Sequence, residues 1–380
     1  MKNTFPGYYR PSEEEFKKLW DECIFVFDTN ILLNLYRYSS ETTDEFIDLM
    51  REISDRIWIP HQVGYEYQED RLGVIKAEEK SYDDLIDLIE ETHEDLENRL
   101  SSKRHPYLKD SDKQMGKLVK IFDEIKSKLN EKKKEYVQLY DSDKIRDKLT
   151  ELFDRKVGAP YSNQELEETC KNGKKRYDKE IPPGYMDPKK LEPEKYGDLV
   201  LWLQAIDKVK EENKPIILIT DEKKEDWWLI HKGKRIGPRP ELIQEMITET
   251  KLPCYIYRAD PFMKNAKKYL QKEIAQEAIN EVREFRERDD EEMLKEKLGL
   301  SDVVTAEVFR PSASNAVKAL ESDAISHAFT LSDLIKNMDA MGKLREALGP
   351  SHQLEEILEN ADAVNRMRDL ISSVQPEGIK

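Results

Sequence analysis

Four short runs of apolar residues lie in the first 260 positions, each bounded by polar or turn-forming residues. They cover residues 23–27 (CIFVF), 56–59 (RIWI), 216–219 (IILI) and 255–257 (YIY). Short runs rich in β-branched and aromatic side chains are typical of strands that are buried on both faces of a parallel sheet. Between these runs, apolar residues recur at helical spacing. The alternation of strands and helices predicts an α/β protein with a three-layer α/β/α core and a parallel sheet.

A different pattern interrupts this core from about residue 75 to 180. There, apolar residues recur every three or four positions among dense charges, which predicts a long insert of two or three helices. After residue 260 the pattern is helical throughout. We therefore predict a core domain over residues 1–260, a charged linking helix over 261–299 and a small all-helical C-terminal domain over 300–380.

The charge balance narrows the function. The chain has 63 Lys and Arg against 79 Asp and Glu, a formal net charge of −16. This argues against a general nucleic-acid coating protein, which would normally be basic. It does not exclude a nuclease, because a carboxylate active site is itself negative until a metal ion neutralises it.

Composition also bears on location. No stretch is apolar enough to span a bilayer, the N-terminus has no apolar segment of a secretion signal, and the three cysteines lack metal-ligand spacing. We therefore expect a cytoplasmic protein with reduced thiols and no membrane partner.

Two of the predicted strands end at an acid. Asp28 directly follows the first run, and Asp221 follows the third run after Thr220. Ligands of open parallel sheets bind beyond the carboxyl ends of the strands, and carboxylates there suit Mg²⁺ or Mn²⁺. Each acid has a simpler explanation, since Asp and Thr are favoured helix N-caps. Capping is the better explanation for either acid alone, whereas the two together indicate a cation site.

Four blocks of sequence, each containing an acid, resemble the PIN-like nuclease domains. The blocks are residues 27–37 (FDTNILLNLYR), 59–67 (IPHQVGYEY), 196–202 (YGDLVLW) and 220–228 (TDEKKEDWW). Their order matches a bacterial subgroup of this family that carries a large helical insert. The resemblance spans roughly residues 5–260 and does not account for the insert or the C-terminal region.

This resemblance implies a metal-dependent nuclease that hydrolyses phosphodiester bonds of RNA or single-stranded nucleic acid with two Mg²⁺ or Mn²⁺ ions. The implied catalytic, metal-holding residues are Asp28, Glu66, Asp198 and Asp221. Asp226 is a further candidate ligand, with Glu225 as the alternative that the sequence leaves open. Asn30 and Thr220 would orient the carboxylates. Family association also implies a toxin-like or anti-phage (antiviral defence) role beside a partner protein such as an ATPase.

Substrate binding needs positive charge near these acids. The candidates are Arg37, Lys174, Lys175, Arg176, Lys223 and Lys224. A solvated helix start explains the lysine pair equally well, and a charged loop without a ligand explains the cluster around residue 175.

The sequence leaves two alternatives to the nuclease. A phosphatase with an aspartyl nucleophile would carry a second acid two residues after Asp28, but that position is Asn30, which leaves the acid/base role unfilled. The other alternative is a nucleic-acid-binding or protein-binding assembly subunit with a weak or inactive PIN core. It would self-associate or bind its partner through the helical insert or the C-terminal helices.

Overall fold

The computed structural model describes residues 1–2, 4–102, 111–186, 191–231 and 234–298. The predicted C-terminal domain over 300–380 lies outside these residues, and the predicted domain boundaries stay predictions. The chain divides into two compact units. The first comprises Met1–Trp227 and Pro238–Arg283, and the second comprises Trp228–Gly237 with the described residues from Glu284 onward.

A four-stranded parallel sheet forms the centre of the first unit. Its strands, in the spatial order β2-β1-β3-β6, are β2 (Ile57–Trp58), β1 (Ile24–Phe27), β3 (Ile216–Ile219) and β6 (Cys254–Tyr257). These are the four strands that the apolar runs predicted. Phe27 pairs with Ile219 in the register, so β1 and β3 end side by side at one edge of the sheet.

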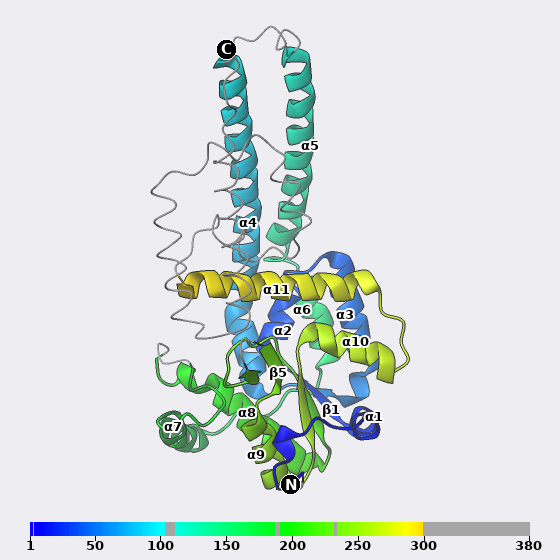
Figure 1. The fold of residues 1–380 in the computed structure, drawn as a ribbon, viewed down its shortest axis with the longest axis vertical. Coiled ribbons are helices and arrows are strands. Elements are labelled where there is room, and N and C mark those ends of the chain that lie inside the picture. Colours follow the sequence, from blue (N-terminus) through cyan, green and yellow to red (C-terminus); the bar gives the residue numbers. More distant parts are fainter. Residues whose placement is uncertain (3, 103–110, 187–190, 232–233, 299–380) are drawn as a thin grey trace, which may run out of the picture. The chain divides into compact units, whose positions relative to one another are not determined.

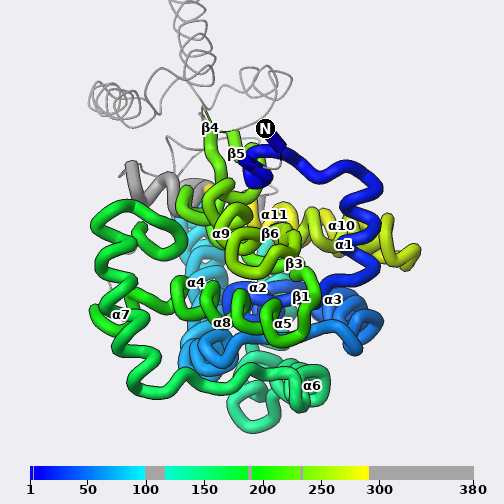
Figure 2. Tube along the Cα trace, turned by 90° about the horizontal axis from the view of Figure 1, so that it is seen from below, coloured from blue at the N-terminus to red at the C-terminus, as the bar shows by residue number. Residues whose placement is uncertain are grey.

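Helices cover both faces of this sheet, as Figure 2 shows. On one face lie α1 (Glu13–Glu22), α3 (Ser40–Glu52) and α10 (Ala259–Tyr269), and on the other lie α4 (His61–Ser102), α8 (Gly197–Glu212) and α9 (Pro240–Thr250). On the first face, Phe262 stacks on Trp20 with ring centroids 5.7 Å apart and meets Phe27 edge-on at the same separation. The predicted three-layer α/β/α core with a parallel sheet is confirmed.

The insert is a helical hairpin whose first arm is a continuation of a core helix (Figure 1). Helix α4 continues from the sheet edge into the hairpin, and α5 (Ser111–Gln138) returns beside it. A buried network fixes the base, where the Asp143 carboxylate accepts from Arg71 Nη1 at 2.6 Å and from the Tyr36 hydroxyl at 2.8 Å. Asp143 also caps α6 (Lys144–Leu152) by accepting the Arg146 N–H. The hairpin is therefore anchored to the core by a fully buried acid with several partners.

The remaining helices of the first unit are α2 (Thr29–Asn34), α6 (Lys144–Leu152) and α7 (Asn163–Tyr177), with short 3₁₀ turns at Pro6–Tyr8, Ser54–Arg56 and Glu194–Tyr196. Strands β4 (Trp228–His231) and β5 (Lys234–Pro238) pair as a small sheet that the sequence did not predict. Helix α11 spans Gln276–Leu298. None of the described helices combines the length and the apolar character needed to cross a membrane.

Candidate active site

The Asp28 carboxylate lies at the carboxyl end of β1, and three groups hold it. Its Oδ1 accepts the Thr29 N–H at 2.6 Å, which caps α2. Its Oδ2 accepts from the Thr220 hydroxyl at 2.6 Å and from Asn30 Nδ2 at 2.7 Å. Asn30 also donates to Thr220 at 3.1 Å, so the ends of β1 and β3 are joined through side chains. Asp28 therefore is the N-cap of α2, as the simpler explanation holds. Its second carboxylate oxygen is held at the sheet edge by Thr220 and Asn30.

Glu66 comes from the first turns of α4 and reaches the same edge. Its Oε2 accepts from the Thr29 hydroxyl at 2.7 Å, one residue from Asp28, and its Oε1 accepts from Gln62 at 2.8 Å. A Cβ added at Gly197 would lie 2.6 Å from Glu66 Oε1. The start of α8 therefore approaches Glu66 closely only because residue 197 has no side chain.

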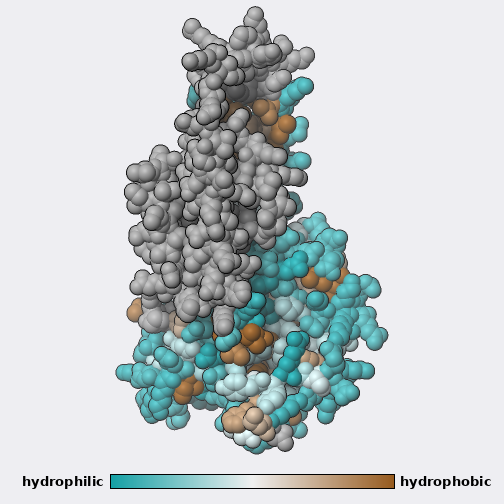
Figure 3. Space-filling model, in the orientation of Figure 1, coloured by the Kyte–Doolittle hydropathy of each residue, from teal (hydrophilic) through white to brown (hydrophobic). Residues whose placement is uncertain are grey.

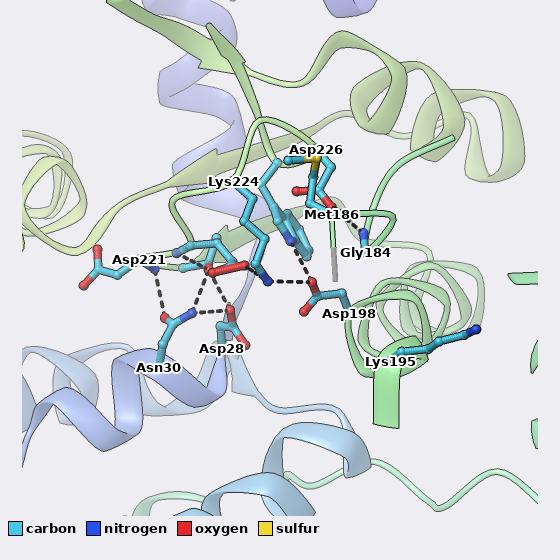
Figure 4. A network of polar contacts seen from close by, with 12 residues as sticks. Asp28, Asn30, Gly184, Met186, Lys195, Asp198, Asp221, Lys224 and Asp226 are labelled. Atoms are coloured by element: carbon cyan, nitrogen blue, oxygen red, sulfur yellow. Dashed lines mark hydrogen bonds and ion pairs between the residues drawn. The ribbon is translucent and has the colours of Figure 1, made fainter. Parts of the chain in front are cut away.

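Asp198 follows that glycine in the first turn of α8. The Trp227 indole N–H donates to its Oδ2 at 3.5 Å, and Lys224 Nζ lies 3.7 Å from the same oxygen (Figure 4). Lys224 Nζ also lies 2.7 Å from Glu222 Oε2. The lysine ammonium thus bridges an acid from α8 and an acid from the loop after β3.

The Asp221 carboxylate is oriented differently from the other three predicted acids. It faces away from Asp28 and Asp198 in Figure 4. Its Oδ1 lies 3.6 Å from Arg258 Nε and accepts the Ala259 N–H at 3.0 Å, while its backbone N–H donates to Asn30. Asp221 as a metal ligand stays a prediction, and its geometry is that of a buried ion pair beside the site.

Glu222 is an acid beside the site that the sequence did not predict. The negative charge of Glu222 raises the pKa of Asp28, and both Glu222 and Asp198 lie close to Lys224 Nζ. The Glu222 carboxylate therefore faces the site. The sequence signal was the adjacent acid pair after Thr220, because successive side chains in an extended segment point in opposite directions. The sequence pattern alone does not predict which of the two acids faces Asp28 and Asp198.

Asp226 has a different set of partners. Its side chain is buried, and Oδ2 accepts the N–H groups of Gly184 at 2.7 Å and Met186 at 3.4 Å. Burial, the largest effect, raises the pKa of Asp226 despite these bonds. Asp226 therefore holds the loop around residue 185 against the site, while the side chain of Glu225 is exposed. A role of Asp226 or Glu225 as a metal ligand stays a prediction.

The predicted basic residues occupy three different settings. Lys174 and Lys175 are exposed on the last turn of α7. Arg176 beside them turns inward, where Nη1 lies 2.5 Å from Glu245 Oε1. Arg37 Nε lies 3.7 Å from the Glu78 carboxylate at the hairpin base. These arginines brace helices, and each role in substrate binding stays a prediction, as it does for Lys223.

Burial and nearby negative charge both favour the protonated form of Asp28. Burial raises its pKa to about 7, and the neighbouring charges of Glu66 and Glu222 raise it as well, while the Thr220 hydrogen bond works in the opposite direction. A buried carboxyl group surrounded by other acids favours a cation or a proton.

A family model described as a PIN like domain matches residues 24–242, which is more than half of the chain. The chain belongs to the PIN-like domain family. The match contains Asp28, Glu66, Asp198 and the loop after β3, and the fold of this PIN-like protein is of the nuclease type. No curated protein and no solved structure matches the chain.

The donor set of this PIN-like site fits a hard divalent cation in chemistry. Its acids offer carboxylate oxygens without histidine or cysteine, which suits Mg²⁺ or Mn²⁺. Among the described residues, no three His, Cys, Asp or Glu side chains are arranged to hold a metal ion as they lie. Instead, the Lys224 ammonium lies between Asp198 and Glu222. The position of the Lys224 ammonium shows that a cation is favoured between these two carboxylates.

Proposed function

We propose that this PIN-like protein is a metal-dependent nuclease that hydrolyses phosphodiester bonds of RNA or single-stranded nucleic acid. The observation that carries the proposal is the meeting of Asp28, Glu66, Asp198 and Glu222 from four chain segments around the ends of β1 and β3. A core fold alone rarely needs so much negative charge in one place, because neighbouring carboxylates repel one another and burial adds to the cost for Asp28.

Asp28, Glu66 and Asp198 would hold Mg²⁺ or Mn²⁺, together with Glu222 or, as the sequence predicted, Asp221. A bound divalent ion supplies a lower pKa for a coordinated water and positive charge for the phosphate oxygens. Asn30 and Thr220 keep the Asp28 oxygens fixed. Lys224, released from Asp198 and Glu222, would pair with a substrate phosphate.

The proposed substrate class rests on the surface charge. Exposed Lys174 and Lys175 give a strongly acidic chain a local basic surface, and phosphate contacts of this kind recognise nucleic acid without reading its sequence. The preference for RNA or single strands, the two-ion reaction, the toxin-like or anti-phage role, the partner protein and the cytoplasmic location stay predictions.

A cleavage assay tests the proposal. End-labelled single-stranded RNA and DNA of one sequence are incubated with Mn²⁺ and with wild type, Asp28→Asn, Glu222→Gln or Asp221→Asn. We expect Asp28→Asn and Glu222→Gln to lose at least about 100-fold in rate, and Asp221→Asn to lose less. The matched control is Asp84→Asn, which removes an exposed acid of the hairpin. Equal cleavage by wild type and Asp28→Asn would remove the active-site assignment and favour the assembly-subunit alternative.

A further inference from the structure

The two arms of the hairpin meet along a regular seam. On α4 the half-buried residues recur at alternating steps of four and three: Tyr82, Ile86, Ile89, His93 and Leu96. On α5 the same spacing holds for Val119, Phe122, Lys126, Leu129, Lys133 and Tyr136. Ring contacts join the arms, with centroids 5.5 Å apart for His93 and Phe122 and 5.4 Å apart for Tyr82 and Tyr136. These are the a and d positions of an antiparallel coiled coil.

A second apolar stripe lies outside this seam and is exposed. Its members are Leu85 (43% exposed), Leu88 (57%), Leu118 (37%), Ile121 (50%) and Ile125 (40%). In the heptads that the seam defines, all five occupy g or c positions, which are neighbours on one flank of a helix. The g flanks of two antiparallel helices lie on the same side, so the five residues share one face of the hairpin. Figure 3 shows apolar surface in brown about half-way along the hairpin.

Ion pairs between the arms set the order along this face. Lys133 Nζ lies 2.6 Å from Asp83, and Lys126 Nζ lies 3.5 Å from Glu90. From base to tip the stripe therefore runs from Leu85 and Leu88 on α4 across to the three apolar residues of α5. It covers about 13 positions, or roughly 20 Å of helix. None of the described residues in 76–98 and 116–141 is buried, so nothing within these arms covers the stripe.

Charges of opposite sign lie in opposite corners of the same face. Lys128 and Lys132, also at c and g positions, lie on α5 beside the leucines, and both are exposed. Lys132 Nζ also lies 3.1 Å from Glu135 Oε1 on its own helix, so Lys128 is the main charge of this corner. Glu91 and Asp95 lie on α4 beside the α5 end of the stripe and are exposed as well. The stripe crosses the face diagonally, from α4 near the base to α5 nearer the tip. A two-fold axis along this diagonal would pack each apolar residue against the same residue of the second copy. It would also pack the basic corner of each copy against the acidic corner of the other. A self-complementary face of this kind is what a closed two-fold dimer requires.

We propose that this face binds a second copy of the same chain, so that two hairpins pack as a four-helix bundle. A nucleic acid is a poor occupant, because acidic Glu91 and Asp95 border the stripe. The dimer does not depend on nuclease activity. It would put two active sites, one at the base of each hairpin, in one particle.

Analytical ultracentrifugation of the full chain, from low to high micromolar concentration, tests the dimer. We expect a concentration-dependent dimer in wild type and self-association at least about tenfold weaker in Ile121→Asp, because a two-fold interface repeats each change. The matched control is Val137→Asp, an equally drastic change of a residue that is 44% exposed at an e position, on the opposite flank of α5. Far-UV circular dichroism of each variant shows whether the hairpin has kept its helices.

Charge reversal gives a second, independent test of the dimer. Lys128→Glu with Lys132→Glu, and Glu91→Lys with Asp95→Lys, should each weaken the homodimer, and an equimolar mixture of the two variants should form a heterodimer. A wild type that stays monomeric, equal dimers in Ile121→Asp and Val137→Asp, or a mixture no tighter than its components would overturn the proposal. Association of wild type only with another protein would likewise show that the occupant is not a second copy.

Discussion

Asp28 combines burial with the neighbouring charges of Glu66 and Glu222, and this makes stability depend on pH. Its folded-state pKa of about 7 exceeds the ordinary 3.8 of the unfolded chain, so the folded state binds the proton more tightly. The stability that this proton contributes is present at low pH and is lost as pH rises through 7. Between pH 5 and 8 the loss amounts to about 3 kcal/mol by proton linkage.

Asp28→Asn should remove this part of the pH dependence, because the amide does not ionise. Urea unfolding of both proteins at pH 5 and pH 8, in EDTA, measures the difference. The other ionisable groups contribute to both proteins, so they cancel in the comparison. The same pH dependence in wild type and variant would mean that Asp28 is already ionised at pH 5.

Lys224 acts as an internal counter-ion for Asp198 and Glu222, and its removal should change cation binding. In Lys224→Met the two carboxylates lose their shared ammonium, so Mn²⁺ should bind several-fold more tightly and raise the melting temperature more than in wild type. Titration calorimetry and thermal unfolding with and without Mn²⁺ measure both effects.

The control is Lys195→Met, which makes the same change of charge. Lys195 points away from Asp198 in Figure 4 and lies 2.8 Å from Glu192. Unchanged or weaker Mn²⁺ binding in Lys224→Met would show that the lysine does not compete with the ion.

At this scale the sequence predicts which segments lie near the site, but not how their side chains are oriented. Asp28, Glu66 and Asp198 could be proposed because each lies in a distinctive block at a strand end or in an early helix turn, and their metal role stays a prediction. Whether Asp221 or Glu222 faces the site depends on Arg258, which pairs with Asp221. Arg258 lies 37 positions after Asp221, between β6 and α10, so only the folded chain brings the two together. The inward orientation of Arg176 could not be predicted for the same reason, because its partner Glu245 lies on α9.

At the scale of elements, the site depends on how closely α4 and α8 approach each other. Gly197→Ala places a Cβ 2.6 Å from Glu66 Oε1, and the flexible glutamate can move aside without unfolding the protein. We expect Mn²⁺ affinity to fall about tenfold, or roughly 1.4 kcal/mol, with a similar loss in cleavage rate, while the melting temperature changes little. Calorimetry and the cleavage assay measure the two losses.

The comparison variant is Gly73→Ala in the middle of α4, where an added Cβ meets no atom within 4 Å. It should leave metal binding unchanged and stabilise the helix by up to about 1 kcal/mol, because alanine is the better helix former. Equal Mn²⁺ affinity in Gly197→Ala and wild type would show that Glu66 is not positioned by this contact.

The elements themselves were largely predictable. Strands β1 and β3 are apolar at every position because both faces are covered, and such runs stand out in a polar chain. The β4–β5 sheet escaped notice because its pattern is half polar: β5 reads KRIGP, and only Trp228 of β4 is buried. The length of α4 was also hard to predict, since its pattern changes from buried residues to half-buried ones among dense charges after Ile75.

At the scale of the whole molecule, the core and the outer hairpin of the first unit are energetically separate. The core is closed at the hairpin base by Asp143, whose partners Arg71 and Tyr36 both belong to the core side. Beyond the Asp83–Lys133 ion pair, none of the described residues is buried. The outer hairpin therefore contributes little to the stability of the core, which leaves association as the property that its apolar stripe affects.

A shortened chain tests this division. Deletion of residues 84–132, with a short glycine-serine link from Asp83 to Lys133, joins two positions that already lie within 2.6 Å through their side chains. We expect a folded protein with a melting temperature within a few degrees of wild type, because no buried residue described between the two ends is lost. Cleavage and Mn²⁺ binding should persist, while the concentration-dependent dimer should disappear. A shortened protein that folds but no longer cleaves would show that the nuclease works only as the hairpin dimer, and one that still dimerises would place the interface elsewhere on the chain.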